Sequence, residues 1–201
     1  MNYLAHFHLS HGNDGLLIGA LLGDFIKGPL KGEREPIIEQ GILLHRKIDV
    51  FTDSHPLLSQ AHQLFDPRYR RYAGIMTDVA FDHFLNRHWQ KFHQQSLSTF
   101  SSEVFQLITS SDHLTPQAKQ QAENLARYDV FASYQHWQTV KAALERISQR
   151  LVRENPLASG AQEMQRHYKL LEEIFLAFYP DLQTYVRELR EKFTQDGYDP
   201  T

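Results

Sequence analysis

The stretch IIEQGILLHRKIDVFTD, residues 37–53, decides the fold class, because its apolar side chains recur at the spacing of one face of an α-helix. It predicts a long helix that is closed by Ser54-His55-Pro56. Upstream, the run LLIGALLGDFI (residues 16–26) is apolar all round and predicts a buried helix that starts at Asp14 and stops at Gly28-Pro29. Two such neighbouring segments favour a helical bundle.

The rest of the chain shows the same helical periodicity, and no run combines strict alternation with β-branched residues. Thr115-Pro116 has the form of a helix cap followed by a proline in the first turn. Pro156 and Pro180 are expected to break helices, with a last helix after Pro180. We therefore predict an all-α protein. Its further helices are expected after Pro56, from Pro67 through residue 92, and at residues 98–110, 118–128, 137–152 and 161–179.

Length and composition limit the classes of protein to which the chain can belong. Its 201 residues, without internal repeats or long linkers, predict a single domain over residues 1–201. The absence of cysteine excludes disulfides, iron–sulfur clusters, thiolate zinc sites and a cysteine nucleophile. With 21 basic and 24 acidic residues, no overall field favours nucleic acid. The longest apolar run (16–22) is too short to span a membrane, and the N-terminus lacks a signal-peptide pattern. We expect a cytoplasmic protein.

Histidine and aspartate gather in the first part of the chain. Nine of the 12 histidines and seven of the 12 aspartates lie within residues 1–93. Metal binding or acid–base chemistry is therefore expected there. Residues 94–195 are interpreted as a helical scaffold that also offers a surface to a partner, and residues 196–201 as a frayed tail.

Asp24 is the one carboxylate near the end of the apolar helix expected at residues 16–26. An isolated buried carboxylate is costly, and the C-terminal end of a helix disfavours negative charge. A positive group should therefore face Asp24. That group is either a bound metal ion or a side chain such as Lys27 or Arg46.

His45 and Asp49 stand four residues apart on the helix expected at residues 37–53, so their side chains share one face. An imidazole and a carboxylate at this spacing can both reach one cation. The alternative is a simple hydrogen bond between the two. Thr52 and Asp53 extend the same side by another turn, and Asp53 is either a ligand or lies behind the ligands.

Asp78 and Asp82 repeat this spacing among apolar neighbours, with His83 directly after them. Two carboxylates on one apolar helix face repel each other unless a cation or a proton lies between them. A place in the first turn of a helix would explain them without a metal, but the helical pattern starts several residues earlier.

Three apolar helices that each present an aspartate are typical of metal sites built inside helical bundles. Histidine and aspartate without cysteine favour Mn²⁺, Mg²⁺ or Fe²⁺ over zinc, and hydrolysis of an oxygen-rich substrate. Of the nearby His6 and His8, which are two residues apart and cannot share a helix face, we expect His6 to point into the site. The remaining histidines of this part of the chain are interpreted as packing or surface residues.

Four segments resemble the acyl carrier protein phosphodiesterases: MNYLAHFHL (1–9), Gly23-Asp24-Phe25, His45 to Asp49 with Thr52-Asp53, and DVAFDHFL (78–85). The similarity extends along most of the chain to Tyr179-Pro180. These proteins are a divergent branch of the metal-dependent, α-helical HD phosphohydrolases, so the resemblance implies an HD-phosphohydrolase-like bundle. The adjacent His-Asp pair of ordinary HD enzymes is absent here, so ligands are taken from local spacing alone.

The resemblance implies hydrolysis of the phosphodiester between 4′-phosphopantetheine and a serine of holo-acyl carrier protein, giving apo-acyl carrier protein and free 4′-phosphopantetheine. The expected cofactor is Mn²⁺, with Mg²⁺ or Fe²⁺ as alternatives. The expected metal ligands are Asp24, His45, Asp49, Asp78 and Asp82. His83 or His6 would supply the proton for the leaving serine oxygen, and Arg46 would hold a phosphate oxygen.

Acyl carrier proteins are acidic, so a local basic surface is expected to bind them. Lys27, Lys31 and Lys47 lie close to the expected ligands. Arg68, Arg70 and Arg71 form a second basic group, for which a solvated helix face is the favoured explanation.

Three other functions are considered. A phosphohydrolase of the same fold could act on a nucleotide or another small phosphoester. A di-iron bundle usually needs Glu-x-x-His pairs, and none of the 12 glutamates has a histidine three residues later. A helical adaptor for an acidic partner would show no metal-dependent turnover and would tolerate loss of Asp24 or Asp82.

Overall fold

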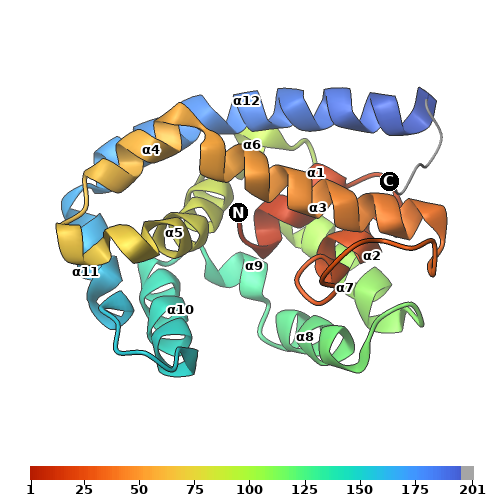
Figure 1. Ribbon diagram of the computed structural model, residues 1–201, viewed down its shortest axis with the longest axis horizontal. Coiled ribbons are helices and arrows are strands. Elements are labelled where there is room, and N and C mark those ends of the chain that lie inside the picture. The colour runs from red at the N-terminus through yellow and green to blue at the C-terminus, as the bar shows by residue number, and fades with distance from the viewer. Residues whose placement is uncertain (196–201) are drawn as a thin grey trace.

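The computed structural model describes residues 1–195, and this part of the chain contains helices and no strand, which confirms the all-α prediction (Figure 1). The tail at residues 196–201, expected to fray, lies outside the described residues. The elements are α1 (Tyr3–Ser10), α2 (Asp14–Leu22), α3 (Pro36–Ser54), α4 (Pro56–Gln63), the 3₁₀ helix η1 (Pro67–Tyr72), α5 (Ala73–Arg87), α6 (Trp89–Phe92), α7 (Leu97–Ser110), α8 (Pro116–Arg127), α9 (Val130–Ser133), α10 (Trp137–Arg150), the 3₁₀ helix η2 (Leu157–Ser159), α11 (Gly160–Arg166) and α12 (Tyr168–Gln195).

The first three helices and α12 set the position of the N-terminus. In Figure 1, α12 runs along the top of the molecule beside α3, with α1 and α2 behind α3. The N-terminus itself lies in the middle of the molecule, between α5 and α1 (Figure 1). The buried apolar side chains form one core cluster to which helices along the whole described chain contribute. No helix within residues 1–195 has the length and apolar character needed to cross a membrane.

Several predicted helix ends differ from the structure. The helix expected to reach Gly28 ends at Leu22, because Gly23 caps it and the chain turns with a bond from the Phe25 amide to the Leu22 carbonyl. The long helix expected from Pro67 is divided into η1, α5 and α6, with a break at His88. Thr115 caps α8 as predicted, by accepting a hydrogen bond from the amide of Ala118.

The predicted break at Pro180 is wrong, because Pro180 lies inside α12. A proline removes one hydrogen bond from a helix interior. Here the apolar face continues on both sides of it, with Phe175 and Phe178 before the proline and Leu182 after it fully buried. Packing of that face outweighs the local cost. The break occurs instead at His167, between α11 and α12.

Glycines allow α2 and α3 to pack at backbone distance. A Cβ atom placed on Gly19 would lie 2.3 Å from the Ile38 carbonyl oxygen and 2.5 Å from the Gly41 Cα atom. Both neighbours are backbone atoms of α3 and cannot rotate away. The two helices therefore keep this separation only while both positions lack a side chain.

We predict that Gly19→Ala destabilises the protein by about 1–3 kcal/mol, because the new methyl group overpacks the contact with α3. The free energy of unfolding from urea denaturation measures this effect. Gly74→Ala is the matched control, since Gly74 is also helical and its Cβ would meet no atom within 4 Å. A Gly19→Ala variant as stable as the control would contradict this account of the contact.

Candidate metal centre

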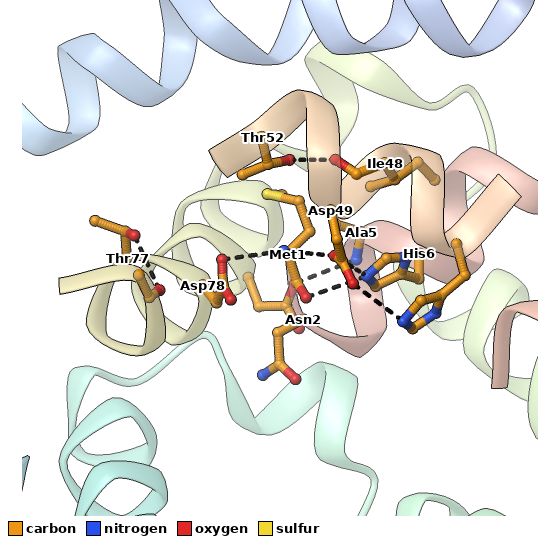
Figure 2. Close-up of polar contacts among 12 residues, drawn as sticks. Met1, Asn2, Ala5, His6, Ile48, Asp49, Thr52, Thr77 and Asp78 are labelled. Carbon is orange, nitrogen blue, oxygen red and sulfur yellow. Dashed lines mark hydrogen bonds and ion pairs between the residues drawn. The ribbon is translucent and has the colours of Figure 1, made fainter. Parts of the chain in front are cut away.

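Three side chains from two helices meet at one point. The Asp49 carboxylate on α3 lies between two imidazoles, with Oδ1 3.1 Å from His6 Nε2 and Oδ2 3.3 Å from His45 Nε2. The two rings are stacked, with centroids 3.8 Å apart and planes 8° from parallel. Potential ligand atoms of all three residues lie within 4.8 Å of one another. Figure 2 shows His6 of α1 reaching toward Asp49. We call these three residues the metal-site cluster.

The local fold fixes the orientation of His45. Its Nδ1 atom lies 2.7 Å from the Ala20 carbonyl oxygen of α2, to which it donates a hydrogen bond. The other ring nitrogen, Nε2, faces Asp49. The ring lies against Gly23, where a Cβ atom would come within 2.2 Å of His45 Cγ. A metal-binding histidine usually donates its other ring nitrogen to a carbonyl or carboxylate, and His45 has this arrangement.

Asp24 lies at the edge of the cluster, in the turn after α2. Its Oδ1 atom is 3.7 Å from His45 Nε2, and its side chain is 46% exposed. The hydroxyl of Tyr3 lies close enough to this carboxylate for the two groups to interact. Burial, followed by the negative charge of Asp24, raises the pKa of Tyr3 above its usual value, so the hydroxyl stays protonated at neutral pH. Asp24 therefore connects the cluster to solvent and to Tyr3.

Burial sets the charges within the cluster. It lowers the pKa of His6 to about 3, with the neighbouring His45 ring adding to the effect. Burial alone would raise the pKa of Asp49, but hydrogen bonds from His45 and His6 hold it well below its usual range. At neutral pH the cluster thus contains a neutral His6 imidazole beside an ionised carboxylate, which is the state that binds a divalent cation. His6 Nδ1 is buried and has no hydrogen-bond partner within the described residues.

The amino group of Met1 was not found by sequence analysis. It is fully buried and forms ion pairs with Asp49 Oδ1 at 3.2 Å and Asp78 Oδ1 at 3.0 Å (Figure 2). A cation was expected between Asp78 and Asp82, whereas this amine pairs with Asp78 and with Asp49 on α3. A backbone amine has no residue letter, so a search by residue type and spacing misses it.

Asp82 and His83 are not brought into the cluster. The fully buried Asp82 accepts hydrogen bonds from the amides of Leu4 (2.9 Å) and Ala5 (3.2 Å), and so caps α1. Burial raises the pKa of Asp82 to about 7. His83 uses both ring nitrogens elsewhere, at 2.7 Å from the Tyr134 carbonyl oxygen and 2.7 Å from the Tyr168 hydroxyl.

The basic residues chosen from the sequence lie around the loop at residues 23–35. Arg46 donates a hydrogen bond to the Ile26 carbonyl at 2.8 Å and so attaches this loop to α3. Lys27 and Lys31 lie on the loop and are exposed, as is Lys47 on α3. Asp53, one turn after Asp49, is also exposed, and its partial burial and the charge of Asp78 raise its pKa.

Comparison with known proteins identifies the family of this chain. The family model for acyl carrier protein phosphodiesterase matches residues 1–182, which include the whole cluster. The chain belongs to the acyl carrier protein phosphodiesterase family. Curated relatives with that name include proteins of Yersinia enterocolitica, 36% identical over 94% of this chain and 98% of the relative, and of Escherichia coli O6:H1, 34% identical over 90% and 94%. A third, from Photorhabdus laumondii, is 35% identical over 90% and 92%. No solved structure matches the chain.

The Met1 ion pairs predict how stability depends on pH in this family member. Burial lowers the pKa of the amino group, but Asp78 and Asp49 outweigh it and raise the pKa from 8.0 to about 10. Because the folded-state value is the higher one, the stabilisation is complete below pH 8 and is lost as pH rises from 8 to about 10. We expect Asp78→Asn to reduce this loss, measured by urea denaturation of metal-free protein from pH 7 to 10.5.

The control for this measurement is Asp112→Asn, which removes an exposed carboxylate distant from the amine in sequence. It should retain the pH dependence of the unmodified protein. Equal pH dependence in the Asp78→Asn and Asp112→Asn variants would show that the amino group does not gain stability from Asp78.

Proposed function

We propose that this phosphodiester hydrolase cleaves the bond between 4′-phosphopantetheine and the serine of holo-acyl carrier protein, releasing 4′-phosphopantetheine and apo-acyl carrier protein. Membership of the acyl carrier protein phosphodiesterase family supports the reaction class. The metal-site cluster of His6, His45 and Asp49 is the observation that carries the proposal.

The donor set suits Mn²⁺, or Mg²⁺ in its place, since it consists of imidazole and carboxylate without sulfur. His6, His45 and Asp49 would hold the ion, with Asp24 at the exposed edge. Such an ion neutralises charge on phosphate oxygens and lowers the pKa of water. Asp78 and Asp82 are not proposed as metal ligands. Asp78 pairs with the amino group of Met1, and Asp82 accepts hydrogen bonds from amides of α1.

The chain's own residues then position the reacting groups. Asp24 and Asp49 present carboxylate oxygens at the partly exposed side of the cluster, where a phosphodiester can enter. The His45–Ala20 hydrogen bond keeps the imidazole facing Asp49 during the reaction. Arg46 lies next to His45 in the chain and supports the loop that carries Asp24.

Water attack forms a new bond to phosphorus and breaks the bond to the serine oxygen. The serine oxygen takes a proton and leaves as the hydroxyl of apo-acyl carrier protein. His83 is too fully engaged with Tyr134 and Tyr168 to supply that proton, and His6 is assigned to the cation. Water at the exposed side of the cluster therefore supplies the proton to the serine oxygen.

We expect purified protein to remove the phosphopantetheine mass from holo-acyl carrier protein with added Mn²⁺ and not with EDTA, as measured by mass spectrometry. Asp49→Asn should lower the rate by about 100-fold or more, because it removes the carboxylate shared by both imidazoles. Asp112→Asn is the control and should keep full activity.

No mass loss with any divalent metal, from protein with a normal cooperative unfolding transition, would overturn the carrier-protein substrate. Release of nitrophenol from bis(4-nitrophenyl) phosphate in the same samples would then favour a small phosphoester as the substrate. Absence of both activities would favour a helical adaptor.

The loop at residues 23–35 is proposed to bind the acidic carrier protein. Lys27 and Lys31 are exposed and lie on the same loop as Asp24. The buried Glu39 holds this loop, because its carboxylate accepts hydrogen bonds from the amides of Gly32 (3.1 Å) and Arg34 (3.2 Å). A held loop presents its charges in fixed positions, which favours electrostatic association.

We predict that Lys27→Glu combined with Lys31→Glu raises the KM for holo-acyl carrier protein about tenfold at low salt and leaves kcat nearly unchanged, because these charges act on encounter. Steady-state kinetics at two ionic strengths measures the effect. Lys169→Glu changes an equally exposed lysine on α12 and serves as the control. The same KM for both variants would exclude the loop as the docking surface.

A further inference from the structure

A cavity of about 370 Å³ is lined by Asn2 and Tyr3 from the N-terminal segment and by later helices, and no residue of the metal-site cluster lines it. One wall comes from α8, with Asn124 and Leu125, and the opposite wall from α10, with Arg146, Ile147 and Arg150. Figure 1 shows α8 and α10 on the two sides below the N-terminus. The volume is in the range of small-molecule sites.

Tyr3 joins this cavity to the cluster. Its side chain lines the cavity, and its hydroxyl lies near enough to Asp24 for that carboxylate to raise the pKa of the tyrosine. Asp24 in turn lies 3.7 Å from His45 Nε2. Arg150 is close enough to Tyr3 for its charge to oppose the rise in the tyrosine pKa, which places a guanidinium near the same hydroxyl. A ligand in the cavity could therefore extend to the cluster past a single side chain.

The lining has the chemistry of a particular kind of ligand. Leu125, Ile147 and Ala143 offer apolar contacts, whereas Asn124 and Gln121 carry amides that can pair with amides of a ligand. Arg146 and Arg150 on α10 add positive charge. An extended, mostly neutral chain with internal amides and one phosphate end matches this lining.

The mouth of the cavity has a further feature of a binding surface. Tyr128, at the end of α8, lines the cavity and is 65% exposed, which is unusual for a large aromatic side chain. The next residue, Asp129, has a positive φ of 39° and begins α9 as its N-cap. This turn holds α9 and Tyr134 against the N-terminal residues, where Asn2 donates a hydrogen bond of 2.7 Å to the Tyr134 hydroxyl.

We propose that this cavity binds the pantetheine arm of the substrate, with the phosphate end toward Asp24 and the thiol end toward Tyr128. The assignment rests on the proposed function, since it names where one part of that substrate lies. It gives α8, α9 and α10, which sequence analysis treated as scaffold, the role of recognising the arm.

Two sets of variants test the cavity. Ala143→Phe fills it from α10, and Arg146→Gln with Arg150→Gln removes its charges without changing the buried core, since both arginines are exposed. We expect each to lower the kcat/KM for holo-acyl carrier protein relative to that for bis(4-nitrophenyl) phosphate by about tenfold or more, chiefly through KM. Arg153→Gln removes an exposed charge near α10 that does not line the cavity, and it should leave this ratio unchanged.

A binding measurement separates this inference from the proposed reaction. Free 4′-phosphopantetheine is titrated calorimetrically into the unmodified full-length protein and into the variants. We expect binding that is weakened about tenfold in both cavity variants and retained in Arg153→Gln. Thermal denaturation shows whether Ala143→Phe is folded. If it is not, the test relies on the variant with both Arg146→Gln and Arg150→Gln.

Unchanged substrate ratios together with unchanged binding in folded cavity variants would overturn the inference while leaving the reaction intact. An equal fall for both substrates would also overturn it, because the cavity would then act on the cluster and not on the arm. Binding of 4′-phosphopantetheine without turnover of holo-acyl carrier protein would instead refute the proposed reaction and support the cavity as a pantetheine site.

Discussion

The contact between α2 and α3 is the constraint on which the candidate site depends. Gly19 meets the backbone of α3 at Gly41, and Gly23, at the end of α2, lies directly against the ring of His45. The same approach brings the Ala20 carbonyl within 2.7 Å of His45 Nδ1. A side chain at Gly23 would displace the imidazole, and wider spacing of the helices would remove its hydrogen bond. Helix packing and the orientation of a candidate metal ligand are therefore one structural feature in this protein.

Insertion of the N-terminus is the second requirement. Buried and partly buried carboxylates need positive or N–H partners, and here the first residues of the chain supply them. Asp82 receives two amides of α1, and Asp78 and Asp49 share the ammonium group of Met1. Together these contacts place α1 so that His6 stacks on His45. The structural work of the aspartates on α5 is thus to position a histidine on another helix.

The parts that could be predicted from sequence are those set within one helix. His45 and Asp49 share a face because of their spacing, and apolar periodicity placed α3 correctly. Whether Asp78 and Asp82 face a metal or the N-terminus depends on another helix, and the same spacing fits both cases. The continuation of α12 through Pro180 could not be predicted from the neighbouring residues either, because it depends on buried packing along the whole helix.

The division of the chain into a catalytic first part and a supporting remainder follows from residue types alone, since histidine and aspartate gather before residue 94. Recognition of a long neutral arm needs different residues, namely amides, apolar side chains and a few arginines, which are common on any helix and give no distinctive pattern. The α8 and α10 walls have this composition, and Tyr3 connects them to Asp24. A candidate site for chemistry is thus visible in sequence, whereas the proposed surface for the substrate arm appears only when two ordinary amphipathic helices are seen to line one cavity.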